Sequence, residues 1–100
     1  IKNTGVNLTY DGIVGGKKKY FFYILRCADN SLYCGMTSNL KNRLREHNSG
    51  GGRGAKYLRG KKPVNLVYSE TFADIGSAMS REAEVKKWPK AKKEELILAG

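Results

Sequence analysis

The alternation of apolar and polar residues first predicts a pair of strands in the N-terminal half of the chain. Tyr20 to Arg26 is rich in aromatic and β-branched residues, and Ser31 to Met36 regains this character after the polar segment Ala28-Asp29-Asn30. Such residues favour strands, and an Asp-Asn pair suits a turn. The pattern predicts a β-hairpin in which Phe21 and Tyr23 share one face, while the residues that alternate with them share the other.

A helix is predicted directly after this hairpin. Two leucines and a histidine recur at the spacing of one helical face, namely Leu40, Leu44 and His47. Thr37 or Ser38 can cap the start of this helix, because a hydroxyl can accept a hydrogen bond from the first free backbone amides. We expect the helix to run to about Asn48.

A loop and a third strand come next. Ser49 to Pro63 contains five glycines and several basic residues, so it reads as a loop with one helical turn around Ala55 to Leu58. Val64 to Thr71 alternates as a strand. On strict alternation one side carries Val64, Leu66 and Tyr68, and the other side carries Asn65, Val67 and Ser69.

The C-terminal part predicts two helices. The first starts at Ile75 or Ser77 and runs to Lys87, and the second runs from Lys90 to Leu98. Pro89 separates them, because proline has no amide hydrogen and disfavours helical geometry in the residue before it.

The element order is therefore ββαβαα, which predicts an α+β fold with a small three-stranded antiparallel sheet flanked by helices. The 100 residues suffice for one domain. Residues 1–19 read as a flexible N-terminal arm with a short edge strand around Val6 to Tyr10. Residues 20–100 form the predicted domain.

Charge narrows the functional classes. The chain has 19 Lys and Arg against 9 Asp and Glu, a net charge of +10, which favours a polyanionic partner such as nucleic acid. The longest uncharged apolar run, residues 20–25, is far shorter than the roughly 20 residues of a membrane span. The spacing of Cys27 and Cys34 fits neither a metal nor a redox motif. We expect a cytoplasmic protein with reduced thiols that does not bind membranes.

Most of this positive charge lies in one segment. Between Lys41 and Lys62 there are eight basic residues and a single acid, Glu46. Glycines in the segment allow close approach to phosphates, and Tyr57 can stack on an unpaired base. A solvated charged surface is the alternative. The predicted nucleic-acid contacts are Lys41, Arg45, Arg53, Lys56, Tyr57, Arg59, Lys61 and Lys62.

Three groups of residues are candidates for chemistry, and each has a structural alternative. Arg43 and His47 lie one helical turn apart and can bind a phosphate and move a proton, but a lone helix histidine is more often structural. Two tyrosines, Tyr23 and Tyr33, can face each other across the hairpin, although such pairs usually serve packing. Glu82 can bind a hard divalent ion, or pair with Lys86 at the next helical turn.

The succession of these residues resembles the GIY-YIG nuclease superfamily. Tyr23 is followed ten residues later by Tyr33-Cys34-Gly35, then by Arg43 and His47, and finally by Glu82 on a late helix. The chain looks like the small single-domain bacterial-type members, and the similarity covers about residues 19–98. The first signature reads Phe-Phe-Tyr instead of Gly-Ile-Tyr, and Cys34 stands where Ile is usual. Some members of the superfamily also use an asparagine that follows the glutamate. No asparagine follows Glu82 in this chain, so no residue is assigned to that role.

The resemblance implies a role for each catalytic residue. Tyr23 would be the general base or its relay to water, and Tyr33 would bind the water or the phosphate. Arg43 would hold the scissile phosphate and lower the phenolic pKa, and His47 would orient a tyrosine or accept its proton. Glu82 would hold one Mg²⁺ or Mn²⁺. The glycine after Cys34 is expected to let the strand approach the helix closely.

The sequence thus predicts a metal-dependent DNA endonuclease of low sequence specificity. Branched, flapped or single-stranded DNA suits the basic loop, and RNA is not excluded. One alternative is a non-catalytic nucleic-acid-binding module on the same fold. A weaker one is a membrane or protein contact through the lysines near Trp88, which Pro89 and the following glutamates disfavour. The oligomeric state stays open.

Overall fold

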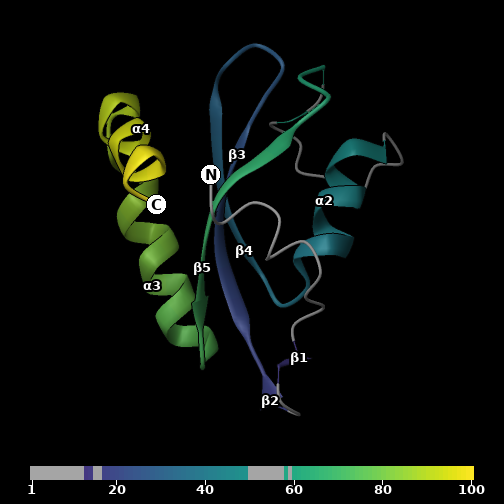
Figure 1. Cartoon of the computed structure of the whole chain (residues 1–100), viewed down its shortest axis with the longest axis vertical. Helices are drawn as coiled ribbons and strands as arrows, with labels where there is room; N and C mark the ends of the chain where they lie inside the picture. The colour runs from purple at the N-terminus through teal and green to yellow at the C-terminus, as the bar shows by residue number, and fades with distance from the viewer. Residues whose placement is uncertain (1–12, 15–16, 50–57, 59) are drawn as a thin grey trace.

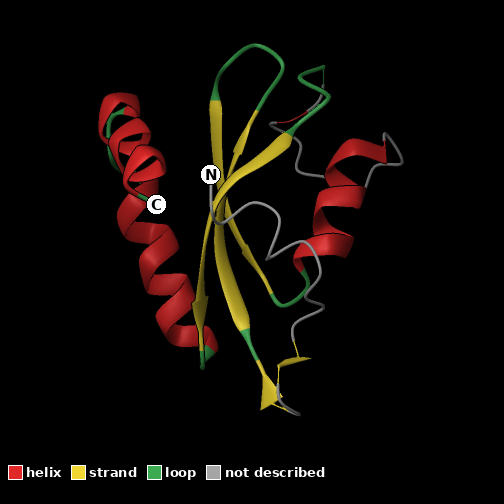
Figure 2. Ribbon diagram, in the orientation of Figure 1, coloured by secondary structure: helices red, strands yellow, loops and turns green. Residues whose placement is uncertain are grey.

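A three-stranded antiparallel sheet lies between helices on both of its faces (Figure 1). We describe the chain from a computed structural model, which covers residues 13–14, 17–49, 58 and 60–100. The sheet has the order β4-β3-β5, and the predicted α+β order is confirmed (Figure 2). Its strands are β3 (Tyr20–Arg26), β4 (Leu32–Thr37) and β5 (Asn65–Phe72). The helices are α2 (Leu40–Ser49), α3 (Ile75–Lys86) and α4 (Lys90–Ala99).

The central strand β3 supplies apolar side chains to both faces of the sheet. Phe21, Tyr23 and Leu25 join the cluster beneath α2, while Phe22 and Ile24 join the cluster beneath α3 and α4. All five are at most 2% exposed. The predicted alternation along this strand is confirmed, and it explains why β3 has so few polar residues.

Helix α2 starts at a different cap from the predicted one. The Asn39 side chain accepts a hydrogen bond from the Asn42 amide at 2.9 Å, so Asn39, and neither Thr37 nor Ser38, is the capping residue. The Thr37 hydroxyl instead accepts from the Asn39 amide at 3.1 Å and shapes the turn before the helix. At the other end, the Asn48 amide group bonds both backbone groups of Val64, at 2.8 and 3.1 Å.

Strand β5 departs from the predicted alternation at one point. Leu66 pairs with Leu25, but Tyr68, two residues on, pairs with the neighbouring Ile24, so Val67 is an extra residue in a β-bulge. The bulge moves Tyr68 to the α3 and α4 face while Leu66 stays on the α2 face. The prediction that these two residues share a side is therefore wrong. A bulge leaves no mark in the apolar pattern.

Two ion pairs tie the C-terminal helices to the sheet. Arg81 of α3 bonds both carboxylate oxygens of Glu70 on β5, at 2.9 and 3.0 Å. Arg26 of β3 bonds both oxygens of Glu94 on α4, at 2.8 and 2.6 Å. Asp74 caps α3 by accepting from the Ser77 amide. The predicted break before α4 is confirmed.

The N-terminal region contributes a separate small ladder. Ile13–Val14 (β1) pairs antiparallel with Lys17–Lys18 (β2), outside the main sheet. The predicted edge strand at Val6 to Tyr10 lies outside the described residues. Within the part of the chain that the structure describes, no helix has the length and apolar character needed to cross a membrane.

Candidate active site

Tyr23 lies at the middle of the central strand, with its side chain toward α2. It pairs with Gly35 on β4 and with Ser69 on β5, and it is 2% exposed. A Cβ at Gly35 would lie 2.6 Å from Cζ of Tyr23 and closer still to its hydroxyl. Gly35 therefore makes room for the phenol ring of Tyr23. The sequence-based expectation was that it makes room for a helix. The missing side chain fixes where the Tyr23 hydroxyl can point.

The Tyr23 hydroxyl is hydrogen-bonded to His47. Its oxygen lies 3.0 Å from Nε2 of His47, which is buried at 3% exposed although it is a potentially charged residue. The ring of Tyr33 meets the imidazole edge-on, with ring centroids 5.5 Å apart. The histidine is thus held between the two tyrosines. In this position it both packs in the core and can exchange a proton with Tyr23.

The tyrosines lie diagonally on one face of the hairpin. Tyr23 is directly opposite Gly35, and Tyr33 is directly opposite Leu25. The two tyrosines therefore lie on the same face of the hairpin, as predicted, but they are not directly opposite each other. The offset leaves room for His47 between the two rings.

Arg43 approaches the same hydroxyl from the preceding turn of α2. Its guanidinium is hydrogen-bonded to Tyr23, and Nη1 forms an ion pair with Glu46 at 3.0 Å. The spacing of four residues places Arg43 and His47 on one side of the helix, as the sequence predicts. The site therefore has a permanent cation at its solvent side, since Arg43 is half-buried.

Burial sets the protonation of this cluster. It lowers the pKa of His47 to about 4, helped by the positive charge of Arg43, so the imidazole is neutral at pH 7. Burial also raises the pKa of Tyr23, and the nearby Tyr33 adds to this effect, against the lowering contribution of Arg43. The expected lowering by Arg43 is therefore present, but burial outweighs it, so the pKa of Tyr23 is raised on balance. A protonated phenol beside a neutral imidazole can donate its proton to Nε2.

Glu82 reaches this region from α3. Its negative charge helps to raise the pKa of Tyr23, of Tyr33 and of Cys34, which places its half-buried carboxylate near the β4 side of the cluster. No ion pair joins it to Lys86 among the described residues, whereas Glu84 in the same helix pairs with Arg81 at 3.1 Å. The salt-bridge alternative for Glu82 finds no support.

The donor set around Glu82 fits one kind of metal site. The described residues contain no group of three or more His, Cys, Asp and Glu side chains that could enclose an ion. A single carboxylate suits Mg²⁺, which keeps several waters and takes further ligands from substrate phosphates. It would not suit a structural Zn²⁺.

Comparison with known proteins decides the family. Residues 19–95 match the family described as the GIY-YIG catalytic domain. The chain belongs to the GIY-YIG family. GIY-YIG catalytic domains characterise an endonuclease superfamily, so the resemblance seen in the sequence is confirmed at this level.

The relatives of this GIY-YIG chain are small proteins of similar length. A UPF0213 protein of Bacillus pumilus is 49% identical over 81% of this chain and 81% of its own length. One from Natronomonas pharaonis is 47% identical over 78% of this chain and 89% of its own. A solution NMR structure of protein EF2693 from E. faecalis is 41% identical, covers 83% of this chain and 86% of its own, and has a TM-score of 0.57. A solution NMR structure of the UPF0213 protein BH0048 from Bacillus halodurans is also 41% identical. It covers 81% of this chain and 84% of its own, with a TM-score of 0.53.

The structure describes four of the eight residues that were predicted to contact nucleic acid. Lys41 and Arg45 are exposed on α2, and Lys62 is exposed on the loop before β5. Lys61 is held by an ion pair with Asp29 at 3.0 Å, so it is less suited to a phosphate than predicted. Arg53, Lys56, Tyr57 and Arg59 lie outside the described residues.

No motif or spacing in the sequence singles out Ser69, which the structure places beside the candidate site. It stands opposite Tyr23 on β5, on the α2 face, and is 6% exposed. Its hydroxyl oxygen is buried and has no hydrogen-bond partner among the residues that the structure describes. Strict alternation would have placed it away from Leu66, so only the bulge brings it beside the tyrosine.

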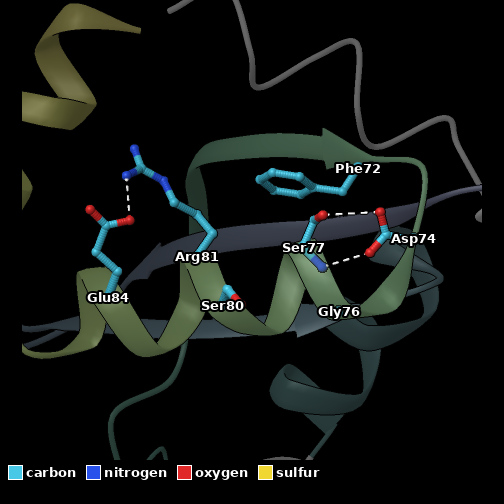
Figure 3. A pocket seen from close by; sticks show the side chains of 7 residues that line it. All are labelled: Phe72, Asp74, Gly76, Ser77, Ser80, Arg81 and Glu84. Atoms are coloured by element: carbon cyan, nitrogen blue, oxygen red, sulfur yellow. Dashed lines mark hydrogen bonds and ion pairs between the residues drawn. The ribbon is translucent and has the colours of Figure 1, made fainter.

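A shallow hollow on the outer side of α3 is not part of this GIY-YIG site. It is lined by Phe72, Ser77, Arg81, Glu84 and their neighbours, and none of its lining residues belongs to the cluster around Tyr23 (Figure 3). Its polar groups are already engaged, since Arg81 pairs with Glu84 and Asp74 caps the helix. Nothing in it resembles a reactive arrangement.

Proposed function

We propose that this protein is a metal-dependent endonuclease that hydrolyses phosphodiester bonds in DNA. The observation that carries the proposal is the buried hydrogen bond between the Tyr23 hydroxyl and a neutral His47, with Arg43 at the same oxygen. A protein that only binds DNA has no need to bury such a proton pathway. The family assignment supports the same reaction class.

The residues divide the work of hydrolysis between them. Tyr23 takes a proton from the attacking water as its own proton moves to Nε2 of His47, so the phenol relays the proton. His47, whose pKa is about 4, accepts it only transiently and releases it again at neutral pH. The guanidinium of Arg43 offers bidentate hydrogen bonds to the scissile phosphate. Tyr33, half-buried at the edge of the site, orients the water or the phosphate. Because the site is largely shielded from water, these polar contacts are stronger than they would be in solvent.

Glu82 is the proposed ligand of one Mg²⁺ or Mn²⁺. When bound, such an ion polarises the phosphate and stabilises the leaving oxygen. The carboxylate has no competing partner among the described residues, which is what a ligand awaiting a metal–phosphate complex requires.

Substrate choice is proposed from charge. The exposed Lys41, Arg45 and Lys62 suit phosphates and offer no geometry for reading base edges, which favours low sequence specificity. Branched, flapped and single-stranded DNA are the proposed substrates.

Cleavage assays on nicked, branched and single-stranded DNA with Mg²⁺ or Mn²⁺ test the proposal. The wild type should cut, EDTA should stop cutting, and Glu82→Ala should lower the rate at least about 100-fold, since a metal contributes several kcal/mol to the transition state. Glu84→Ala is the matched control, because it removes a glutamate from the same helix outside the site. Equal cutting by Glu82→Ala and the wild type would refute the metal ligand.

A binding module on the same fold is the second candidate. One observation favours it: Arg43 is already paired with Glu46, so its guanidinium is partly occupied before any phosphate arrives. If the wild type binds DNA with a steep salt dependence but cuts no substrate with either metal, the binding module is the better description.

A further inference from the structure

A second basic segment lies at the junction of α3 and α4. Residues 86–93 contain five lysines and no acid. Residues 41–62 carry a net charge of +7 and residues 86–93 carry +5, which together make +12. Because the net charge of the whole chain is +10, the remaining residues together carry −2. These two segments therefore carry the largest excess of positive charge, and a shorter basic run, Lys17 to Lys19, lies outside both.

Most of the lysines at this junction are available to a ligand. Lys90 pairs with Glu94 at 2.8 Å. Among the residues that the structure describes, the other four form no ion pair; Lys86, Lys87 and Lys92 are exposed, and Lys93 is half-buried. Lys92 lies with its Nζ 4.2 Å from the ring centroid of Trp88, which also receives Arg81 at 5.4 Å. These contacts fix the turn between the two helices.

The junction borders the proposed metal ligand. Glu82 and Lys86 are four residues apart on α3 and so share one side of the helix. Lys93 lies in the first turn of α4. Cys34 of the edge strand β4 packs in one cluster with Val85 of α3 and Ile97 of α4. Burial raises the pKa of its thiol, and the charges of Lys93, Glu82 and Lys86 also act on it. Lys86 and Lys93 are thus gathered with Glu82 over one residue of β4.

We propose that the α3–α4 junction, through Lys86 and Lys93, is a second phosphate-binding surface that holds the nucleic-acid backbone on the side of Glu82 opposite to α2. This rests on the proposed function, because the two surfaces then flank one scissile phosphate. A backbone crossing the β4 edge would meet α2 first, the reactive cluster next and the lysines last. Lysine suits this role as a point charge without base preference.

Binding measured without metal tests the surface separately from catalysis. Lys86→Gln/Lys93→Gln is compared with Lys18→Gln/Lys19→Gln, which removes the same charge near β2, away from both helical layers. In EDTA, the salt slope of duplex binding should fall by about 1.8 for the first variant, at about 0.9 per phosphate contact, and affinity near 0.1 M salt should fall more than about tenfold. The control should lose less than a quarter of that slope.

Trp88 provides a second readout. It is the only tryptophan in the chain, so its fluorescence reports this surface alone. Adding a short DNA duplex should change the emission of the wild type and not that of the Lys86→Gln/Lys93→Gln variant.

The outcomes separate this inference from the proposed nuclease activity. If the double variant keeps the wild-type slope, the second surface is refuted, even if the protein cuts DNA. If the slope falls but no substrate is cut, the surface stands and the nuclease proposal falls. If Trp88 responds to vesicles containing phosphatidylserine and not to DNA, the partner is an anionic membrane and the inference is wrong.

Discussion

Gly35 determines the position of the Tyr23 phenol, and it does so by having no side chain. Any Cβ at this position would overlap the ring, as the 2.6 Å separation from Cζ shows. The ring is buried between two strands and a helix, so it has little freedom to move aside. The glycine is required by its contact with the reactive residue and not by its backbone angles.

Gly35→Ala should therefore damage both stability and activity. We expect the free energy of unfolding to fall by about 1–3 kcal/mol, as for overpacking in a core, and cleavage to fall because the Tyr23 hydroxyl leaves His47. Chemical denaturation and the cleavage assay measure the two effects. Gly76→Ala, in the exposed first turn of α3, is the control: its Cβ would lie 3.3 Å from Oδ1 of Asp74 and touch no residue of the cluster around Tyr23, so cleavage should stay at the wild-type level whatever the small effect on stability. A Gly35→Ala protein as stable and active as the wild type would contradict the packing argument.

The sequence predicted the members of the reactive cluster but not all of their contacts. Tyr23, Tyr33, Arg43 and His47 follow from motif order and helical spacing. Their protonation does not, because it depends on burial that only the packed structure supplies. Ser69 was missed because its position beside Tyr23 depends on the bulge.

At the level of elements, β5 shows how one residue changes the faces of a strand. Val67 is the extra residue, and it packs against the same cluster as Tyr68. Without it, Leu66 and Tyr68 would keep their present partners, Leu25 and Ile24, in a regular ladder. The bulge therefore accommodates one extra residue. A strand without Val67 would reach the same pairing with β3 with no bulge.

Deletion of Val67 should be tolerated. We expect a folded protein that loses about 1–2 kcal/mol of stability, the contribution of one partly buried valine side chain. Deletion of Ser69 is the matched control; it brings Tyr68 or Glu70 opposite Tyr23 and should cost more than about 4 kcal/mol. Circular dichroism with urea titration distinguishes them. Equal loss of structure in both deletions would show that the bulge itself is essential.

Element boundaries were predicted well where the signal is chemical and local. Pro89 separates α3 from α4, as expected, and most of the predicted glycine-rich loop lies outside the described residues. The cap of α2 was assigned to Thr37 or Ser38, but Asn39 holds it. Three adjacent residues can all cap a helix, and Thr37 is used instead in the turn before it, where its hydroxyl accepts from the Asn39 amide.

For the whole molecule, the single histidine links stability to pH. His47 has a pKa of about 4 when folded, against an ordinary value of 6.5. Protons therefore bind the unfolded chain more readily, and stability falls as pH drops from 6.5 toward 4. The full effect of such a shift is about 3 kcal/mol.

Urea titrations between pH 7 and pH 4.5 measure this dependence. Glu94, whose pKa is lowered to about 2 chiefly by its hydrogen bond to Arg26, contributes only below this range. His47→Gln should lose most of the slope while starting from lower stability. A wild-type stability that stays constant from pH 7 to pH 4.5 would mean that His47 is not buried as described.

The order of the strands also has a consequence for how the protein forms during synthesis. The β3–β4 hairpin and α2 are local in sequence and carry Tyr23, Tyr33, Arg43 and His47. Local contacts form early, whereas the pairing of β3 with β5 must close a long loop first. Glu82 comes 35 residues after His47, beyond that pairing. A nascent chain would therefore hold the residues of the proposed proton relay before the proposed metal ligand, so the proposed site is completed only after β5 docks on β3.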